Sequence, residues 1–82
     1  MRKFLVGIDG TYTPDPDYWR ARNEFIVADS AEEAIKIWSY LRGEWLREDE
    51  IPYIKIVEVP VEESYGAAYR YKFTETGFAD CE

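Results

Sequence analysis

The sequence of 82 residues contains no histidine. This absence excludes imidazole general bases, Ser-His-Asp and Cys-His nucleophilic schemes, and zinc sites with a histidine ligand. An enzyme built on this chain would have to use carboxylates, tyrosine, lysine or arginine. We therefore expect a protein that is not an enzyme and holds no cofactor and no metal ion.

Cysteine and long apolar runs are also scarce. Cys81 is the single cysteine, so no internal disulfide can form, whereas small secreted scaffolds are normally rich in disulfides. Near the N-terminus the longest apolar run is Phe4-Leu5-Val6, which is too short for a signal peptide or a membrane span. We expect a cytoplasmic protein without membrane contacts.

Basic residues are outnumbered, since 17 acidic residues face ten lysines and arginines and give a net charge of −7. Binding of phosphate groups needs lysine and arginine to displace counterions, so direct binding of nucleic acid is not expected. An acidic surface attracts basic protein surfaces, but it also keeps a domain soluble. The charge therefore favours basic partners over acidic ones. It leaves open whether the acidity serves partner binding or solubility.

What the chain does contain is apolar and aromatic material, at 46% hydrophobic and 17% aromatic residues. This is enough to fold one domain over residues 1–82 without a metal or a disulfide. The core of so short a chain is thin, so the rings outnumber what it can bury. We expect some tyrosine and tryptophan side chains to stay half exposed.

Alternating apolar residues predict four strands. Their expected ranges are 3–9, 19–28, 53–59 and 67–75. In the first, Phe4, Val6 and Ile8 share one face, and Gly7 on the other face allows another group to pack closely. Two prolines indicate a loop over 10–18, and the end of the chain, 77–82, is expected to be a frayed tail.

One helix is predicted between the second and third strands. Ser30 and Glu33 have the spacing of a capping box. A core-facing stripe at helical spacing follows: Ala31, Ala34, Ile35, Trp38 and Leu41. Gly43 is a natural stop, although the apolar pattern also allows the helix to run on to Arg47.

These elements define an α+β fold in the order β-β-α-β-β. We expect a four-stranded mixed or antiparallel sheet with the single helix on one face. A helix between two strands favours a parallel relation between them. One helix covers one sheet face, so the other face is predicted to be open.

No motif predicts a calcium or phosphate site. Counted from Asp9 or Asp15, the twelfth position that should hold a calcium-binding glutamate holds Arg20 or Ile26. Gly7 and Gly10 are not followed by the lysine and helix of a phosphate loop. The bases Arg20, Arg22, Arg70 and Lys72 are expected to pair across strands with Glu24 and Glu58.

Two acidic clusters flank the third predicted strand and are the best candidates for binding. Either they oppose a basic groove on a partner protein, or they are solvated loop ends. Tyrosine and tryptophan are enriched at interface hot spots, so exposed rings are added to the candidates. The predicted contact residues are Trp45, Glu48, Asp49, Glu50, Glu62, Glu63, Tyr69 and Tyr71.

The stretch from Phe25 to Ile35, FIVADSAEEAI, resembles the strand-then-helix unit of small phage-encoded proteins, some of which are anti-CRISPR inhibitors. The resemblance implies a short acidic binder acting in the cytoplasm of a host cell. The same stretch also resembles the β-β-α core of HicB-type antitoxins, although their glycine-rich approach to the helix is missing here. Neither resemblance assigns a role to a particular residue.

Two functional hypotheses follow. The first is a non-enzymatic inhibitor or adaptor of the anti-CRISPR kind, which places an acidic, aromatic surface on a basic groove of a partner protein, including a groove built for nucleic acid. The second is a structural or antitoxin-like subunit that forms a homodimer through the open face of its sheet.

Overall fold

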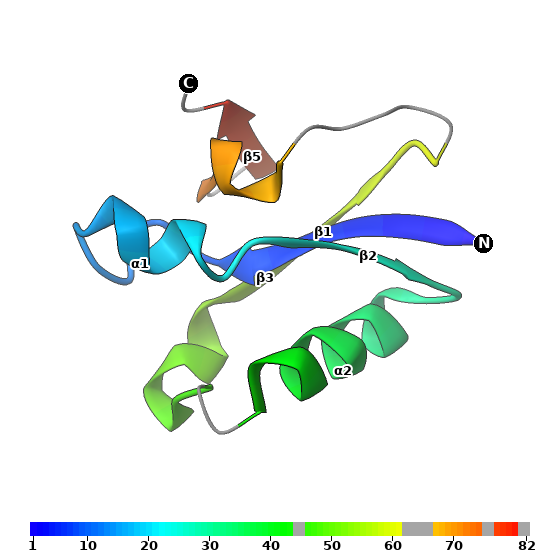
Figure 1. Cartoon of the computed structure of the whole chain (residues 1–82), viewed down its shortest axis with the longest axis horizontal. Helices are drawn as coiled ribbons and strands as arrows, with labels where there is room; N and C mark the ends of the chain where they lie inside the picture. The colour runs from blue at the N-terminus through cyan, green and yellow to red at the C-terminus, as the bar shows by residue number, and fades with distance from the viewer. Residues whose placement is uncertain (44–45, 62–66, 75–76, 81–82) are drawn as a thin grey trace.

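The computed structural model describes residues 1–43, 46–61, 67–74 and 77–80. The described part has three layers, with a central sheet, one long helix on one side and a smaller β-unit on the other (Figure 1). The elements in chain order are β1 (Arg2–Ile8), α1 (Pro16–Arg20), β2 (Glu24–Ala28), α2 (Ala31–Arg42), the 3₁₀ helix η2 (Glu48–Tyr53), β3 (Ile54–Val59), the 3₁₀ helix η3 (Ala68–Arg70), β4 (Tyr71–Thr74) and β5 (Gly77–Asp80).

The central sheet has three strands in the order β2-β1-β3. Both ladders are antiparallel, and Phe4 lies between Ile26 of β2 and Glu58 of β3. Because β2 and β3 both run against β1, they are parallel to each other, as the helical crossover predicted. They are not neighbours, however, since β1 lies between them.

The four-stranded sheet that we expected is not formed by the described residues. β4 pairs instead with β5 in a separate two-stranded sheet, which is joined to the end of β1 by a bridge between Asp9 and Phe73. β5 lies inside the stretch where a frayed tail was expected. The fourth predicted strand is also shorter, because residues 68–70 form a 3₁₀ turn closed by a bond from Arg70 N to Ala67 O of 3.2 Å.

Helix α2 begins as its sequence predicted, with Ser30 Oγ accepting a hydrogen bond of 3.1 Å from Glu33 N. Ala34 and Trp38 are fully buried against Phe4, Val6 and Ile8 of the sheet. The helix ends at Arg42, and Gly43 follows with a φ of 54° that favours glycine. Leu41 was wrongly assigned to the core, since 54% of its surface is exposed.

The sheet face away from α2 is covered over part of its area, although Val27 of β2 stays 48% exposed on it. Leu5, Val59 and Phe73 form a second buried cluster on that side, with partly buried neighbours Phe25, Val57, Ala68 and Tyr71 packed against it. The packing over Gly7 is close, since Phe73 Cε2 would lie 3.0 Å from an added β-carbon and the Asn23 amide would overlap it. The predicted close packing over Gly7 is confirmed, and the predicted open face is wrong.

The segment before β2 contains a short helix where loop and strand were expected. Asp15 caps α1 by accepting a bond of 3.0 Å from Asp17 N, and Pro16 occupies the first turn, where its missing N–H costs nothing. Trp19 is buried by this turn, at 4% exposure. β2 therefore begins only at Glu24.

Candidate functional site

Three tyrosine rings and two carboxylates meet where the segment before and within α1 packs on η2. This tyrosine–carboxylate cluster consists of Tyr12, Tyr18, Asp49, Glu50 and Tyr53. The rings of Tyr12 and Tyr18 stack with centroids 5.4 Å apart, and Tyr53 meets Tyr12 edge-on at 5.0 Å. The rings thus hold η2 against the α1 side of the molecule.

Each of the first two tyrosines donates its hydroxyl proton to a carboxylate of η2. Tyr12 Oη donates to Asp49 Oδ2 over 2.9 Å, and Tyr18 Oη donates to Glu50 Oε1. The pKa of Tyr12 is raised to about 12. Partial burial is the largest cause, and the hydrogen bond to Asp49 is the next largest. Burial and the bond to Glu50 also raise the pKa of Tyr18, so both phenols stay protonated donors at neutral pH.

The pKa of Asp49 is shifted in the opposite direction. The hydrogen bond from Tyr12 lowers the pKa of its carboxyl, and Arg47, whose Nε lies 3.2 Å from Asp49 Oδ1, lowers it further. The Asp49 side chain nevertheless remains 59% exposed. It is therefore a fixed negative charge that a partner can reach.

Glu50 was predicted to be a contact residue, and this is wrong because it is fully buried. The 3₁₀ turn of η2 points its side chain inward, where Oε1 also accepts a bond of 3.3 Å from Arg22 Nη2. Arg22 lies over the ring of Tyr18, with 4.1 Å from Cζ to the ring centroid. Glu50 thus supports the cluster from beneath and is not available to a partner.

The basic residues are held by contacts within the chain. Six of them form ion pairs: Arg2 with Glu58, Arg22 with Glu50, Lys36 with Glu32, Arg42 with Glu24, Arg47 with Asp49 and Lys55 with Asp9. Others lie over aromatic rings, as Lys3 does over Phe25 and Arg20 and Lys72 do over Trp19. Arg70 also has an interaction partner. Glu24 and Glu58 therefore pair with Arg42 and Arg2, and not with the bases that the sequence suggested.

The acids are distributed differently. Within the part of the chain that the structure describes, four exposed carboxylates take part in no ion pair or side-chain hydrogen bond, namely Asp17, Asp29, Glu33 and Glu48. Asp17 and Glu48 belong to α1 and η2, beside the tyrosine–carboxylate cluster. Asp29 and Glu33 lie at the start of α2, at the other end of the sheet (Figure 1). The charge that the fold leaves unpaired is negative.

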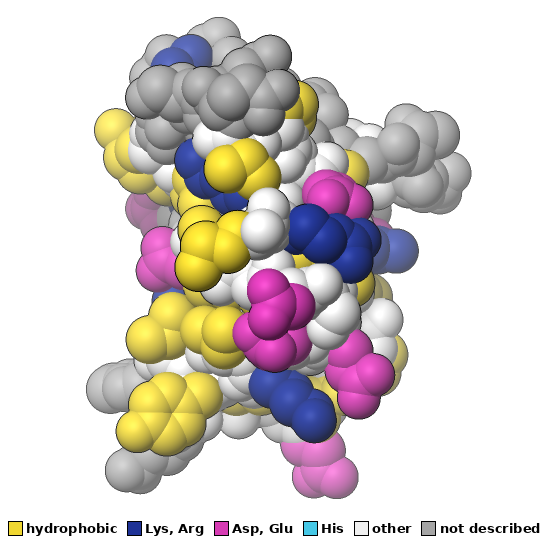
Figure 2. Space-filling model, turned by 90° about the vertical axis from the view of Figure 1, so that its right-hand side faces the viewer, with side chains coloured by type: hydrophobic (Ala, Val, Ile, Leu, Met, Phe, Trp, Pro, Cys, Tyr) yellow, Lys and Arg dark blue, Asp and Glu magenta, His cyan; other side chains and the backbone are white. Residues whose placement is uncertain are grey.

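The side of the molecule where β1 and α2 begin carries mixed charges. In Figure 2 acidic and basic side chains lie next to one another on this side, and hydrophobic side chains gather along one half of the view. No patch of a single sign is seen there. The α1–η2 end carries Asp17, Glu48 and Asp49 near the tyrosine rings, with one exposed base, Arg47, that is paired with Asp49, and we take it as the candidate for an acidic contact surface.

The structure thus brings together only some of the predicted contact residues. Glu48 and Asp49 are exposed at the cluster, whereas Tyr69, 56% exposed, lies on η3 and outside it. Tyr71 is half-buried against Phe25, with ring centroids 6.1 Å apart. The remaining three predictions, Trp45, Glu62 and Glu63, fall outside the described residues.

Sequence reasoning missed the three tyrosines of the cluster. Tyr12 and Tyr18 lie on either side of the two prolines that were read as loop, and Tyr53 was assigned to a strand. The signal available was the presence of large rings in a proline-rich segment, where a solvated loop would have little use for them. It did not show which carboxylates the rings would meet.

Neither a metal site nor a membrane span is found in the described ranges. No group of three or more cysteine, aspartate or glutamate side chains there is placed to hold a metal ion. None of the helices described combines the length and apolar character needed to cross a bilayer. No protein-family model, curated protein or solved structure matches the chain.

Proposed function

We propose that this α+β domain is a non-enzymatic, protein-binding inhibitor or adaptor of the anti-CRISPR kind, acting in the cytoplasm of a host cell. Its contact surface is the acidic α1–η2 end, formed by Asp17, Glu48 and Asp49 with Tyr12 and Tyr53. The partner offers a basic groove, such as one that otherwise holds nucleic acid. The protein itself does not bind nucleic acid or membrane.

The observation that carries this proposal is the unequal use of charge. Nine of the ten lysines and arginines lie against carboxylates or rings of the same chain and Arg70 also has a partner, whereas exposed carboxylates are left without partners. A cationic partner therefore meets two unpaired acids, Asp17 and Glu48, and only Asp49 of the contact surface is already in an internal ion pair, with Arg47. Complementary charge of this kind raises association rates and disfavours partners of the wrong sign.

The tyrosines add a rigid component to this surface. Tyr12 is fixed by its stack with Tyr18 and by its bond to Asp49, and Tyr53 is 39% exposed beside it. Aromatic rings held in place lose little conformational entropy on binding and attract arginine and lysine side chains. We do not adopt the second hypothesis, self-association through an open sheet face, because residues of β4 and η3 pack on part of that face.

The test compares two double variants with the same change in net charge. Asp17→Asn with Glu48→Gln neutralises the α1–η2 end, and Asp29→Asn with Glu33→Gln neutralises the start of α2. Each double variant is used to capture partner proteins from a lysate of the host cell. In a second experiment, phage plaque counts measure how far each variant inhibits CRISPR interference in that host. We expect about tenfold weaker partner binding for the first pair, since two interfacial charges are removed, and little change for the second. Equal effects of both pairs, or none, would contradict the proposal.

A further inference from the structure

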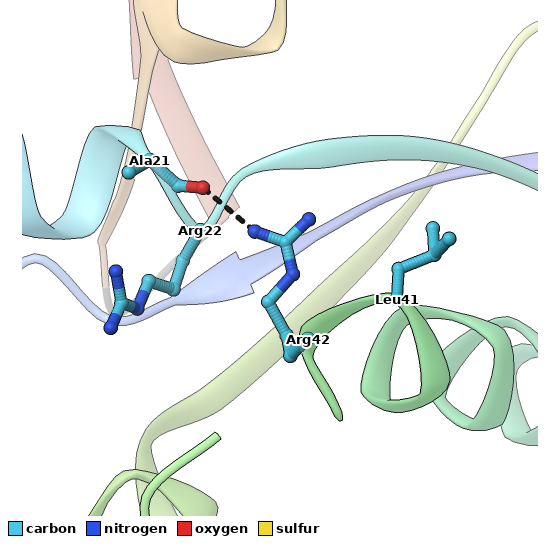
Figure 3. A pocket seen from close by; sticks show the side chains of 4 residues that line it. All are labelled: Ala21, Arg22, Leu41 and Arg42. Atoms are coloured by element: carbon cyan, nitrogen blue, oxygen red, sulfur yellow. Dashed lines mark hydrogen bonds between the residues drawn. The ribbon is translucent and has the colours of Figure 1, made fainter. Parts of the chain in front are cut away.

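A pocket of about 310 Å³ lies between the end of α2 and the connection from α1 to β2. The described residues that line it are Ala21, Arg22, Leu41 and Arg42. Figure 3 shows Arg42 reaching from the last turn of α2 to the carbonyl of Ala21, with Leu41 beside it. Two arginines and one exposed leucine thus share a pocket whose size suits a small organic molecule.

Both arginines are fixed before any ligand arrives. Arg42 Nη1 donates to Ala21 O over 2.8 Å, and its guanidinium lies over the ring of Trp38, with 5.7 Å from Cζ to the centroid. Arg22 is held by Glu50 and by the ring of Tyr18, and its carbonyl accepts a bond of 2.6 Å from Trp38 Nε1. A ligand therefore does not have to order these side chains, which lowers the entropic cost of binding.

Arg42 has hydrogen-bonding capacity left over. Its contact with Glu24 is a single one, 3.4 Å from Nη2 to Oε1, and the Glu24 side chain is 44% exposed. Arg42 Nε, like Nε of Arg22, is buried without a hydrogen-bond partner among the described residues, so a ligand would contact the terminal Nη groups of Arg42. A partly exposed ion pair with one long contact is weak, so an incoming anion can replace Glu24 at the guanidinium.

The charges around the pocket select a monoanion. Glu24 and Glu50 already balance Arg42 and Arg22, so a doubly charged phosphate would face more repulsion than a carboxylate. A planar carboxylate also matches the two parallel N–H groups that a guanidinium offers. Leu41, 54% exposed, provides an apolar wall for the remainder of the molecule.

We propose that this pocket binds a carboxylate carrying a short branched apolar group, with the carboxylate taking the place of Glu24 at Arg42 and the apolar group covering Leu41. This pocket is a different site from the contact surface at the α1–η2 end, although Arg22 also holds Glu50 and Tyr18 there. The overall negative charge of the protein opposes it only weakly at physiological ionic strength, where charges are screened beyond about 8 Å.

The direct test is a titration of the ¹⁵N-labelled protein with 3-methylbutanoate, followed by NMR of the arginine Nε–Hε groups. We expect saturable shifts of Arg42 and Arg22, with a dissociation constant on the order of 1 mM for so small a ligand. The matched alcohol, 3-methylbutan-1-ol, should cause none. Absence of saturable shifts, or shifts spread evenly over all arginines, would overturn the proposal.

Three variants make the test specific. Glu24→Gln removes the competing carboxylate and should tighten binding about threefold, and Arg42→Gln should weaken it about tenfold or more. Arg20→Gln is the control, because Arg20 also lies over a tryptophan and also has a buried, unpartnered Nε but does not line the pocket. If Arg42→Gln fails to fold, the Glu24→Gln variant alone decides. Unchanged or weaker binding by this variant would refute the replacement of Glu24 by the ligand carboxylate at Arg42.

The same titration identifies the source of the carboxylate. N-acetyl-leucine carries the carboxyl group of a peptide end, and N-acetyl-leucinamide lacks its charge. Tighter binding of N-acetyl-leucine than of 3-methylbutanoate would identify a peptide C-terminus as the ligand, and the reverse order would identify a free acid. Binding of the amide as tight as that of the acid would contradict recognition of a carboxylate.

Discussion

Arg22 donates a hydrogen bond from Nη2 to the buried carboxylate of Glu50 over 3.3 Å, and this contact joins the α1–β2 connection to η2. Replacing Arg22 by methionine keeps the apolar stem but leaves the Glu50 charge buried without its cation. Such a loss costs about 3 kcal/mol of unfolding free energy, which urea denaturation would measure.

The control for this pair is a double variant. Adding Glu50→Gln to Arg22→Met removes the uncompensated charge, so we expect part of the lost stability to return. Arg47→Met breaks a comparable but exposed ion pair with Asp49 and should cost well below 1 kcal/mol. If Arg22→Met were no more damaging than Arg47→Met, Glu50 would not act as a buried charge.

At Gly7 the residues that pack on the sheet come so close to β1 that no side chain fits there. A β-carbon there would overlap the amide of Asn23, whose Nδ2 donates to the carbonyls of Ala68 and Tyr71. Gly7→Ala is therefore expected to destabilise the domain by about 2 kcal/mol through overpacking, as thermal unfolding would show. A stability equal to that of the parent chain would mean that η3 and β4 do not pack on β1 as described.

Ser30 is the cap of α2, and its hydroxyl satisfies the backbone N–H of Glu33. We expect Ser30→Ala to cost about 1 kcal/mol of unfolding free energy, because that donor would lose its partner. Ser39→Ala, inside the same helix, serves as the comparison and should be neutral or slightly stabilising, since alanine is the better helix former. Similar losses in both variants would rule out a specific role for the cap.

Tyr12 predicts a fall in stability at alkaline pH. Its pKa is raised to about 12 in the folded state, whereas an unfolded tyrosine titrates at about 10. The stabilisation is therefore complete below about pH 10 and is lost as the pH rises toward about 12. Tyr12→Phe should lower the free energy of unfolding at neutral pH. In urea denaturation, this free energy should also fall less steeply with pH over the same range than it does in the parent protein.

Tyr40→Phe is the appropriate control for that experiment, because Tyr40 is 86% exposed on α2. This variant should lose stability at alkaline pH to the same extent as the parent protein. Part of the fall should also persist in Tyr12→Phe, since the pKa of Tyr18 is raised as well. If Tyr12→Phe and Tyr40→Phe behaved alike, the bond between Tyr12 and Asp49 would contribute nothing to folding.

The features that sequence predicted correctly are governed by neighbouring residues. The cap at Ser30, the stop at Gly43 and the alternation of Phe4, Val6 and Ile8 each depend on spacing within one element. The pairing of β4 with β5 was missed because the sequence between the two strands, Glu75-Thr76, is not the Asn-Gly or Asp-Gly pair that predicts a tight turn. Local rules thus gave the helix and the first strand but not the second sheet.

The candidate site depended on contacts between distant parts of the chain. Glu48-Asp49-Glu50 has the composition of a solvated connection, yet Glu50 is drawn inward by Tyr18 and Arg22, which lie 32 and 28 positions away. No periodic pattern in three consecutive acids distinguishes the buried one from its exposed neighbours. Their different roles are set by the tertiary packing of α1 against η2.

The central position of β1 also sets the order of events during folding. Val6 pairs with Ile56, so the ladder between β1 and β3 closes a loop that includes β2 and α2. Because both of its partners follow it in the chain, β1 gains its second neighbour only when β3 is in place, and its apolar face must wait for that strand. We expect folding to be limited by this late closure, and nascent chains that end before β3 to depend on chaperones to keep β1 from aggregating.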